Sequence, residues 1–240
     1  MSKMIGLSRK VKLQWLDKTV ELALQDLSTQ DIHDKLNEYL SFEISSPTVL
    51  RKTREILMNV WIYDDSDGVR LRQDALKLIK ENSDDSLPVH WCMLLAAYPV
   101  FADVCRLIGK LSEFQDEITL AQIRQKLYDT WGERTTLFHS LDKIMATIKE
   151  LGAIQSVKPG RYRIVKHPVC STQVVTFMAY TMMVVNGESY YRISDIDHSS
   201  LFFPFEYHVD KQVLLSDEKF TINNFGGDLT VSLRCSDVSC

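Results

Sequence analysis

The feature that most constrains the fold is an apolar stripe within residues 133–151. Five apolar residues recur there at spacings of 4, 3, 4 and 3: Leu137, Leu141, Ile144, Ile148 and Leu151. This is the period of one face of an α-helix. Gly152 follows, and glycine suits the end of a helix because it adopts the left-handed conformation without strain. The pattern predicts a long amphipathic helix with one side in a core and the other in solvent.

The segment before this helix predicts a helix-turn-helix. Residues 118–120 fit a short strand and residues 121–131 fit a helix, which Gly132 separates from the long helix. The apolar residues of the shorter helix that we expect to face inward are Ile123, Leu127 and Trp131.

The segment after the long helix predicts a β-hairpin. Residues 153–157 and 161–165 fit two strands joined by Lys158, Pro159 and Gly160. Pro-Gly suits the central positions of a type II turn, because glycine accepts the positive φ required at the second of them. We therefore predict a winged helix-turn-helix over residues 115–167, in which this hairpin is the wing.

Charge is unevenly distributed along the chain, although the net charge is only -4. Residues 118–167 hold nine basic and four acidic residues, a net charge of +5, whereas residues 168–240 hold four basic and nine acidic residues, a net charge of -5. Two regions of opposite sign do not share one surface for a polyanion. The central segment is the candidate for contact with duplex DNA, and the acidic region is the candidate for contact with protein.

The DNA-binding prediction names particular side chains of the long helix and the wing. Opposite Leu137 the helix presents Thr135, Thr136, His139, Asp142 and Lys143. Of these, we expect Lys143, together with Arg134, to contact phosphate, and Thr135, Thr136 and His139 to contact bases or sugars. Asp142 opposes this arrangement because a carboxylate is repelled by a polyanion. The wing adds four cations without an acid between residues 157 and 167: Lys158, Arg161, Arg163 and Lys166.

Residues 1–114 predict a helical domain. The first helix has an apolar stripe at Leu13, Leu16, Val20 and Leu24. Ser28 with Asp31 three residues later is typical of the start of a second helix. Ser46 followed by Pro47 predicts a third, to about residue 60. A fourth runs through Leu71, Ala75 and Leu78, and a helical hairpin over residues 89–114 bends at Pro99.

Residues 168–240 predict a mixed assembly region of helix and antiparallel strands. A helix over residues 172–185 ends at Asn186-Gly187, and residues 206–215, 219–223 and 228–233 alternate as strands do, with a turn at residues 225–227. Phe202, Phe203 and Phe205 flank Pro204 and fit either core packing or a docking surface. The fold class is therefore α+β and mainly helical.

Several classes of protein lack support in the sequence. The apolar runs at residues 94–105 and 174–185 are shorter than a membrane span, and no secretory signal opens the chain, so we expect a cytoplasmic protein that does not contact a membrane. Five cysteines without a C-x-x-C pair fit buried free thiols. The motifs of metalloproteases, nucleotide-binding proteins and serine hydrolases are absent, so we predict no catalytic residues, no metal and no cofactor.

The acidic segment Asp64, Asp65, Asp67 and Gly68 tests the metal prediction. A calcium loop has a glycine at position 6, an acid at position 1 and a bidentate glutamate at position 12. With Gly68 at position 6, Tyr63 stands at position 1 and Asp74 at position 12. A solvated turn fits better. A metal-dependent nuclease that uses these acids together with Glu55 remains an alternative.

The chain resembles the BrxA family, small accessory proteins of bacterial BREX phage-resistance systems. Three features carry the resemblance: the amphipathic helix around residues 13–24, the run Ser46-Pro47-Thr48 followed by Arg51 and Arg54, and a basic winged segment that ends in His167-Pro168. The resemblance implies a helical, non-catalytic, DNA-binding protein of a defence system, which contacts other subunits of that system. It also adds Arg51 and Arg54 to the candidate DNA contacts. The alternatives are a protein-interaction or scaffold subunit and a transcriptional regulator.

Overall fold

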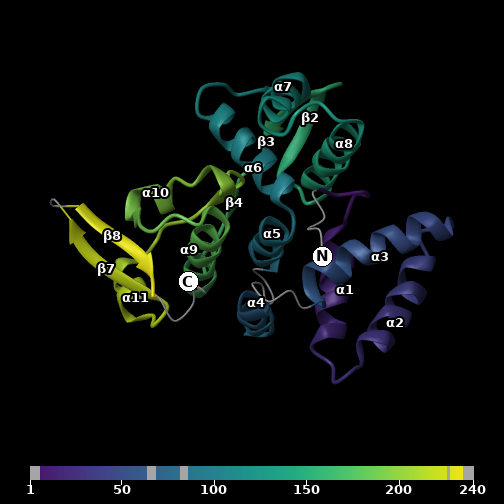
Figure 1. Ribbon diagram of the computed structural model, residues 1–240, viewed down its shortest axis with the longest axis horizontal. Coiled ribbons are helices and arrows are strands. Elements are labelled where there is room, and N and C mark those ends of the chain that lie inside the picture. The colour runs from purple at the N-terminus through teal and green to yellow at the C-terminus, as the bar shows by residue number, and fades with distance from the viewer. Residues whose placement is uncertain (1–5, 64–68, 82–85, 226–227, 235–240) are drawn as a thin grey trace.

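The computed structural model describes residues 6–63, 69–81, 86–225 and 228–234. These residues are mainly helical, with 62% helix, eleven helices and three small sheets (Figure 1). The α+β, mainly helical class is therefore confirmed. Four predicted features lie outside the described residues: the acidic turn at residues 64–68, the Gly226-Gly227 turn, Cys235 and Cys240.

The N-terminal helices begin where local chemistry predicts. They are α1 (Leu13–Ala23), α2 (Thr29–Ser41), α3 (Pro47–Trp61) and α4 (Val69–Glu81). Ser28 and Asp31 form a capping box at the start of α2, and Pro47 is the first residue of α3. The prediction that Leu24 faces the core is wrong, because α1 ends one residue earlier and Leu24 is 44% exposed.

Helix α5 (Ser86–Ala97) lies at the centre of the molecule and is followed by α6 (Pro99–Ser112). Its residues 88–95 are all buried, which requires neighbours on every side. It packs against α1, α3, α4, α6 and α9 (Thr172–Asn186). Helices α5 and α6 are bent by 119° relative to each other, which agrees with the bend predicted at Pro99. No single helix in the described ranges is both long and apolar enough to cross a membrane; only the bent α5–α6 pair reaches that length and composition together.

A helical pair and a small sheet follow α6. In chain order the elements are β1 (Ile118–Thr119), α7 (Leu120–Trp131), α8 (Thr135–Glu150), β2 (Ile154–Lys158) and β3 (Arg161–Ile164). Strand β3 lies between β1 and β2 and pairs antiparallel with both. Gly160 has a φ of 73°, as the turn prediction requires. The apolar stripe of α8 is buried, and α7 places Ile123 and Leu127 inward while Trp131 is half-buried.

The C-terminal region packs on α5 through α9 and a run of aromatic residues. Phe202, Phe203 and Phe205 are each no more than 5% exposed, and the rings of Phe203 and Phe205 meet Trp91 edge to face at 5.5 and 5.6 Å. Core packing is therefore the correct interpretation of this run, and a docking surface is excluded because the side chains do not reach solvent. The remaining C-terminal elements are β4 (His167–Pro168), β5 (Tyr191–Arg192), α10 (Ile193–Asp197), η2 (Ser200–Phe202), β6 (Phe205–Glu206), α11 (Lys211–Ser216), β7 (Phe220–Phe225) and β8 (Asp228–Leu233).

The C-terminal strand predictions are partly wrong. Strands β7 and β8 form the predicted antiparallel pair. Residues 206–215, however, contain the end of the two-residue strand β6 and most of helix α11. Asp210 caps that helix by accepting a hydrogen bond from the backbone N–H of Gln212 at 2.8 Å. An aspartate at an N-cap favours helix, and this local signal outweighs the apolar alternation.

The cysteine prediction holds for two of the three described thiols. Cys92 and Cys105 are buried, and burial raises the pKa of Cys92 to about 12, so that thiol stays protonated at neutral pH. Cys170 is exposed, contrary to the prediction, because it lies in the short link between β4 and α9.

The N-terminal strap, residues 6–12, lies against α8. Leu7 and Val11 are buried, and the backbone N–H of Val11 donates to Thr147 Oγ1 at 3.0 Å. Lys10 pairs with Glu150 at 2.8 Å. At Gly6, an added Cβ would overlap Ser140 Oγ and lie 3.1 Å from Ser140 Cβ, so any other residue here requires Ser140 to move.

We expect Gly6→Ala to destabilise the protein by about 1–3 kcal/mol, because the new methyl group overpacks the contact with Ser140. Ser140→Ala should be close to neutral, since the buried Ser140 hydroxyl has no hydrogen-bond partner. The double variant should recover part of the Gly6→Ala loss. Urea unfolding of all four proteins measures this coupling. Strictly additive effects would show that the strap does not contact Ser140.

Buried His90 makes the stability of the fold depend on pH. It is 0% exposed, its Nε2–H donates to Asp17 Oδ1 at 2.9 Å, and its Nδ1 is buried without a partner. Burial lowers its pKa below the usual 6.5, although the Asp17 carboxylate opposes the shift. The unfolded state therefore binds the proton more readily.

We expect the stability present above pH 6.5 to be lost as the pH falls toward the lowered folded pKa, by up to about 1.4 kcal/mol per pH unit. His90→Gln should flatten this dependence, as measured by urea unfolding at a series of pH values below 6.5. The matched control is His198→Gln, because His198 is exposed. An equal slope in wild type and His90→Gln would contradict the assignment.

Candidate nucleic-acid interface

The outward side of α8 brings together five of the predicted site residues. Arg134 stands at the N-cap and is exposed, as are Thr135, Thr136 and His139, while Lys143 is half-buried one turn further along. They project outward because the apolar stripe on the other side of the helix occupies the core. We call these five residues the α8 face.

The start of α8 favours an anion. No side chain caps it, so the first backbone N–H groups of the helix have no side-chain acceptor. Free amides at a helix N-terminus bind phosphate well. The exposed acid Glu133, which precedes Arg134, works against this.

An arginine lies beside Asp142, the acid that the sequence places against DNA binding. Arg124 of α7 lies 4.0 Å from Asp142 Oδ1, and its guanidinium stacks over the ring of Phe138 at 4.4 Å from the centroid. The sequence did not predict this pairing, because Arg124 and Asp142 lie on different helices. The negative charge that Asp142 places beside the α8 face is therefore partly offset.

The wing arginines are paired with an acid that sequence analysis overlooked. Arg161 Nη1 lies 3.6 Å from Glu117 Oε2, and Arg163 Nη2 lies 3.5 Å from Glu117 Oε1. Glu117 directly precedes β1, and β1 pairs with β3 so that Thr119 faces Arg161. The two arginines remain about half exposed. Their positive charge is thus reduced but still accessible.

The wing arginines and the α8 face do not form one continuous ridge. Tyr162 lines a hollow of about 200 Å³ with Asp142, Met145 and Ala146 of α8. Because side chains alternate along a strand, Arg161 and Arg163 project from the opposite side of the sheet. Burial and the nearby Asp142 carboxylate raise the pKa of Tyr162, so its hydroxyl stays protonated.

The other two wing lysines differ in their surroundings. Lys158 is exposed at the end of β2, beside the Pro159-Gly160 turn. Lys166 donates from Nζ to the backbone carbonyl of Phe203 at 2.8 Å. This bond fixes the ammonium group beside the C-terminal region and uses one of its three N–H groups, so the contact of Lys166 with phosphate stays a prediction.

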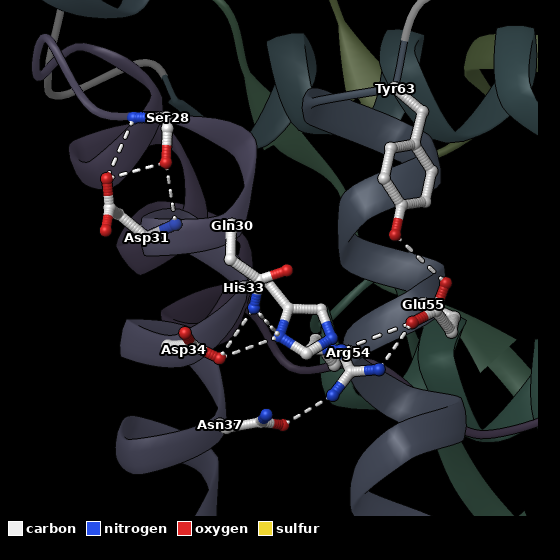
Figure 2. Close-up of polar contacts among 9 residues, drawn as sticks. All are labelled: Ser28, Gln30, Asp31, His33, Asp34, Asn37, Arg54, Glu55 and Tyr63. Atoms are coloured by element: carbon white, nitrogen blue, oxygen red, sulfur yellow. Dashed lines mark hydrogen bonds and ion pairs between the residues drawn. The ribbon is translucent and has the colours of Figure 1, made fainter.

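The Arg54 prediction is corrected. Arg54 is 7% exposed, and Figure 2 shows its guanidinium held between α2 and α3. It donates to Glu55 Oε1 at 2.6 Å and to Asn37 Oδ1 at 2.7 Å, while Tyr63 donates to the other oxygen of Glu55 at 3.1 Å. Arg54 joins two helices and offers no free cation to DNA.

Arg51 is exposed and stands apart from the α8 face. It lies on α3, which packs against α1, α2 and α5, and it lines an open hollow of about 590 Å³ between α2 and α3. The hollow contains acidic as well as basic side chains, since Glu38 lines it too. Arg51 is therefore a separate basic residue.

The nuclease alternative loses one of its named residues. Glu55 is occupied by Arg54 and Tyr63, and Asp64, Asp65 and Asp67 lie outside the described residues. Within the described part of the chain, no group of three or more His, Cys, Asp or Glu side chains is placed to hold a metal ion.

Comparisons with protein-family models, with curated proteins and with solved structures find no match to this chain.

If the wing contacts DNA, Glu117→Gln should tighten binding, because it releases Arg161 and Arg163 from their shared carboxylate. We expect a lower Kd and a steeper salt dependence, measured by fluorescence anisotropy with a labelled duplex at several salt concentrations. Glu113→Gln is the matched control, since Glu113 is exposed at the end of α6 and the substitution changes the charge equally. Equal effects of both variants would point to net charge alone.

Proposed function

We propose that the protein is a non-enzymatic, duplex DNA-binding protein in which α6 to β3 form a winged helix-turn-helix. The element order α6, β1, α7, α8, β2, β3 and the strand order β1-β3-β2 support this interpretation. Helix α6 packs against α7, α8 and β1, so the proposed winged unit includes α6 and begins earlier than the predicted boundary at residue 115.

The observation that carries the proposal is the α8 face. A helix enters the major groove with its early residues against base edges, and its N-terminus favours phosphate. On α8 these early residues are Thr135, Thr136 and His139, all exposed, with Arg134 before them. We assign phosphate contact to Arg134 and Lys143, and base or sugar contact to the other three.

The wing takes a secondary role in this proposal. Lys158 at the turn contacts the DNA backbone, and Arg161 and Arg163 contribute once phosphate competes with Glu117. Arg51 stands outside the proposed interface. Arg54 is left out because Glu55 and Asn37 hold its guanidinium, and Lys166 is left out because the Phe203 carbonyl holds its ammonium group beside the C-terminal region.

The biological role is proposed from the resemblance to the BrxA family. We propose an accessory subunit of an anti-phage defence system, with DNA and other subunits as partners. The proposed cytoplasmic location rests on the sequence, in which we find no secretory signal. In this proposal the region of residues 168–240 contacts those subunits, because its net charge of -5 disfavours contact with DNA. A scaffold subunit or a transcriptional regulator is the alternative role.

We expect the double variant Arg134→Ala with Lys143→Ala to weaken duplex binding at least about tenfold. The salt dependence of log K should fall by about one unit for each lost phosphate contact. The measurement is an anisotropy titration at several salt concentrations, and circular dichroism checks that the variant is folded. Lys211→Ala on α11 is the control, because Lys211 is exposed in the acidic region.

An unchanged affinity and slope would contradict the assignment of the α8 face. A folded wild-type protein without measurable duplex binding would favour the scaffold role instead.

A further inference from the structure

The N-terminal strap lies beside the α8 face, and we infer that Arg9 of the strap makes a second contact with the DNA backbone. This inference rests on the proposed function, since it adds a residue to the same interface. Arg9 is not among the DNA contacts that the sequence predicts.

The strap is a fixed part of the folded protein. Leu7 and Val11 are 1% and 0% exposed, and the Val11 N–H donates to Thr147 Oγ1. Gly6 lies against Ser140 at the other end of the strap. These contacts hold both ends of residues 6–11 against α8, so the residues between them have little freedom. Figure 1 shows this N-terminal segment passing close to α8.

Helix geometry places the middle of the strap beside Lys143. The strap contacts Ser140 and Thr147, which are seven residues apart and therefore lie on the same side of α8. Lys143 is three residues after Ser140 and four before Thr147, and residues at these spacings are surface neighbours. The strap runs in the same direction as α8, so Arg9 lies at about the level of Lys143.

The charges of the strap complement a phosphate chain. Glu150 lies at the C-terminal end of the outward side of α8, seven residues after Lys143. Lys10 forms an ion pair with it and so offsets its negative charge. Arg9 donates a hydrogen bond from Nη1 to the Ser8 carbonyl at 2.6 Å, and it forms no ion pair with an acid in the described ranges. Its guanidinium keeps other N–H groups for a bidentate contact with phosphate.

The occupant that fits this arrangement is the sugar-phosphate backbone of duplex DNA. A helix in the major groove has a phosphate chain on each side of it. On one side of α8 lies the strap with Arg9, and on the other lies the hollow that Tyr162 lines. Arg9 therefore holds the strand on the strap side and contributes affinity without sequence preference.

The test is an anisotropy titration of the full chain against labelled duplexes of two unrelated sequences, each at several salt concentrations. We expect Arg9→Ala to weaken binding about threefold to tenfold on both sequences and to reduce the salt slope by about one unit. Arg9→Lys should keep the wild-type slope, because it keeps the charge. Lys211→Ala is the matched charge control, and thermal unfolding checks that each variant is folded.

The outcomes separate this inference from the proposed function. If Arg134→Ala with Lys143→Ala weakens binding and Arg9→Ala matches Lys211→Ala, the strap contact is wrong and the α8 face stands. If Arg9→Ala weakens binding on one sequence only, Arg9 contacts bases and the backbone assignment is wrong. If the wild-type chain binds neither duplex, both proposals fail.

Discussion

Helix α8 is enclosed on three sides, and the proposed interface depends on this enclosure. Its apolar stripe packs into the core, the strap holds the side with Ser140 and Thr147, and the β2–β3 hairpin approaches the side with Asp142 and Met145. One strip of the helix is left for solvent. A helix fixed in this way presents its outward side chains with little loss of conformational entropy on binding. The same packing stabilises α8 although no side chain caps its N-terminus.

Pairing in space redistributes the charge of the basic segment. Glu117 reduces the charge of the two wing arginines, Arg124 compensates Asp142, and Lys10 compensates Glu150. As a result, less unpaired positive charge is left on the wing, and more of what remains lies on the α8 face and the strap. Such surface pairs add little stability, so their main consequence is electrostatic. A phosphate must compete with Glu117 for the wing arginines. At Arg134 a phosphate meets no such competing ion pair among the described residues.

The central helix α5 sets the positions of the other elements. It contacts the N-terminal helices on one side and α9 on another, and Trp91 on α5 receives Phe101, Phe203 and Phe205 around its ring. The Trp91 Nε1–H also donates to the Leu201 carbonyl at 3.0 Å. Buried side chains from all three predicted regions form one hydrophobic core, so the segments that carry the candidate interface are positioned by the whole molecule.

The sequence by itself determined the features that depend on neighbouring residues. The capping box at Ser28, the proline start of α3, the stripe of α8 and the Pro159-Gly160 turn all follow from contacts within a few residues, and these contacts act in almost any surroundings. Only the tertiary structure decided which cations remain available. Arg54 contacts Asn37, which lies 17 residues away in the chain, and Lys166 contacts Phe203, which lies 37 residues away. The wing arginines pair with Glu117 across more than 40 residues. A charge acts through space rather than along the sequence, so its partner appears only when the chain is folded.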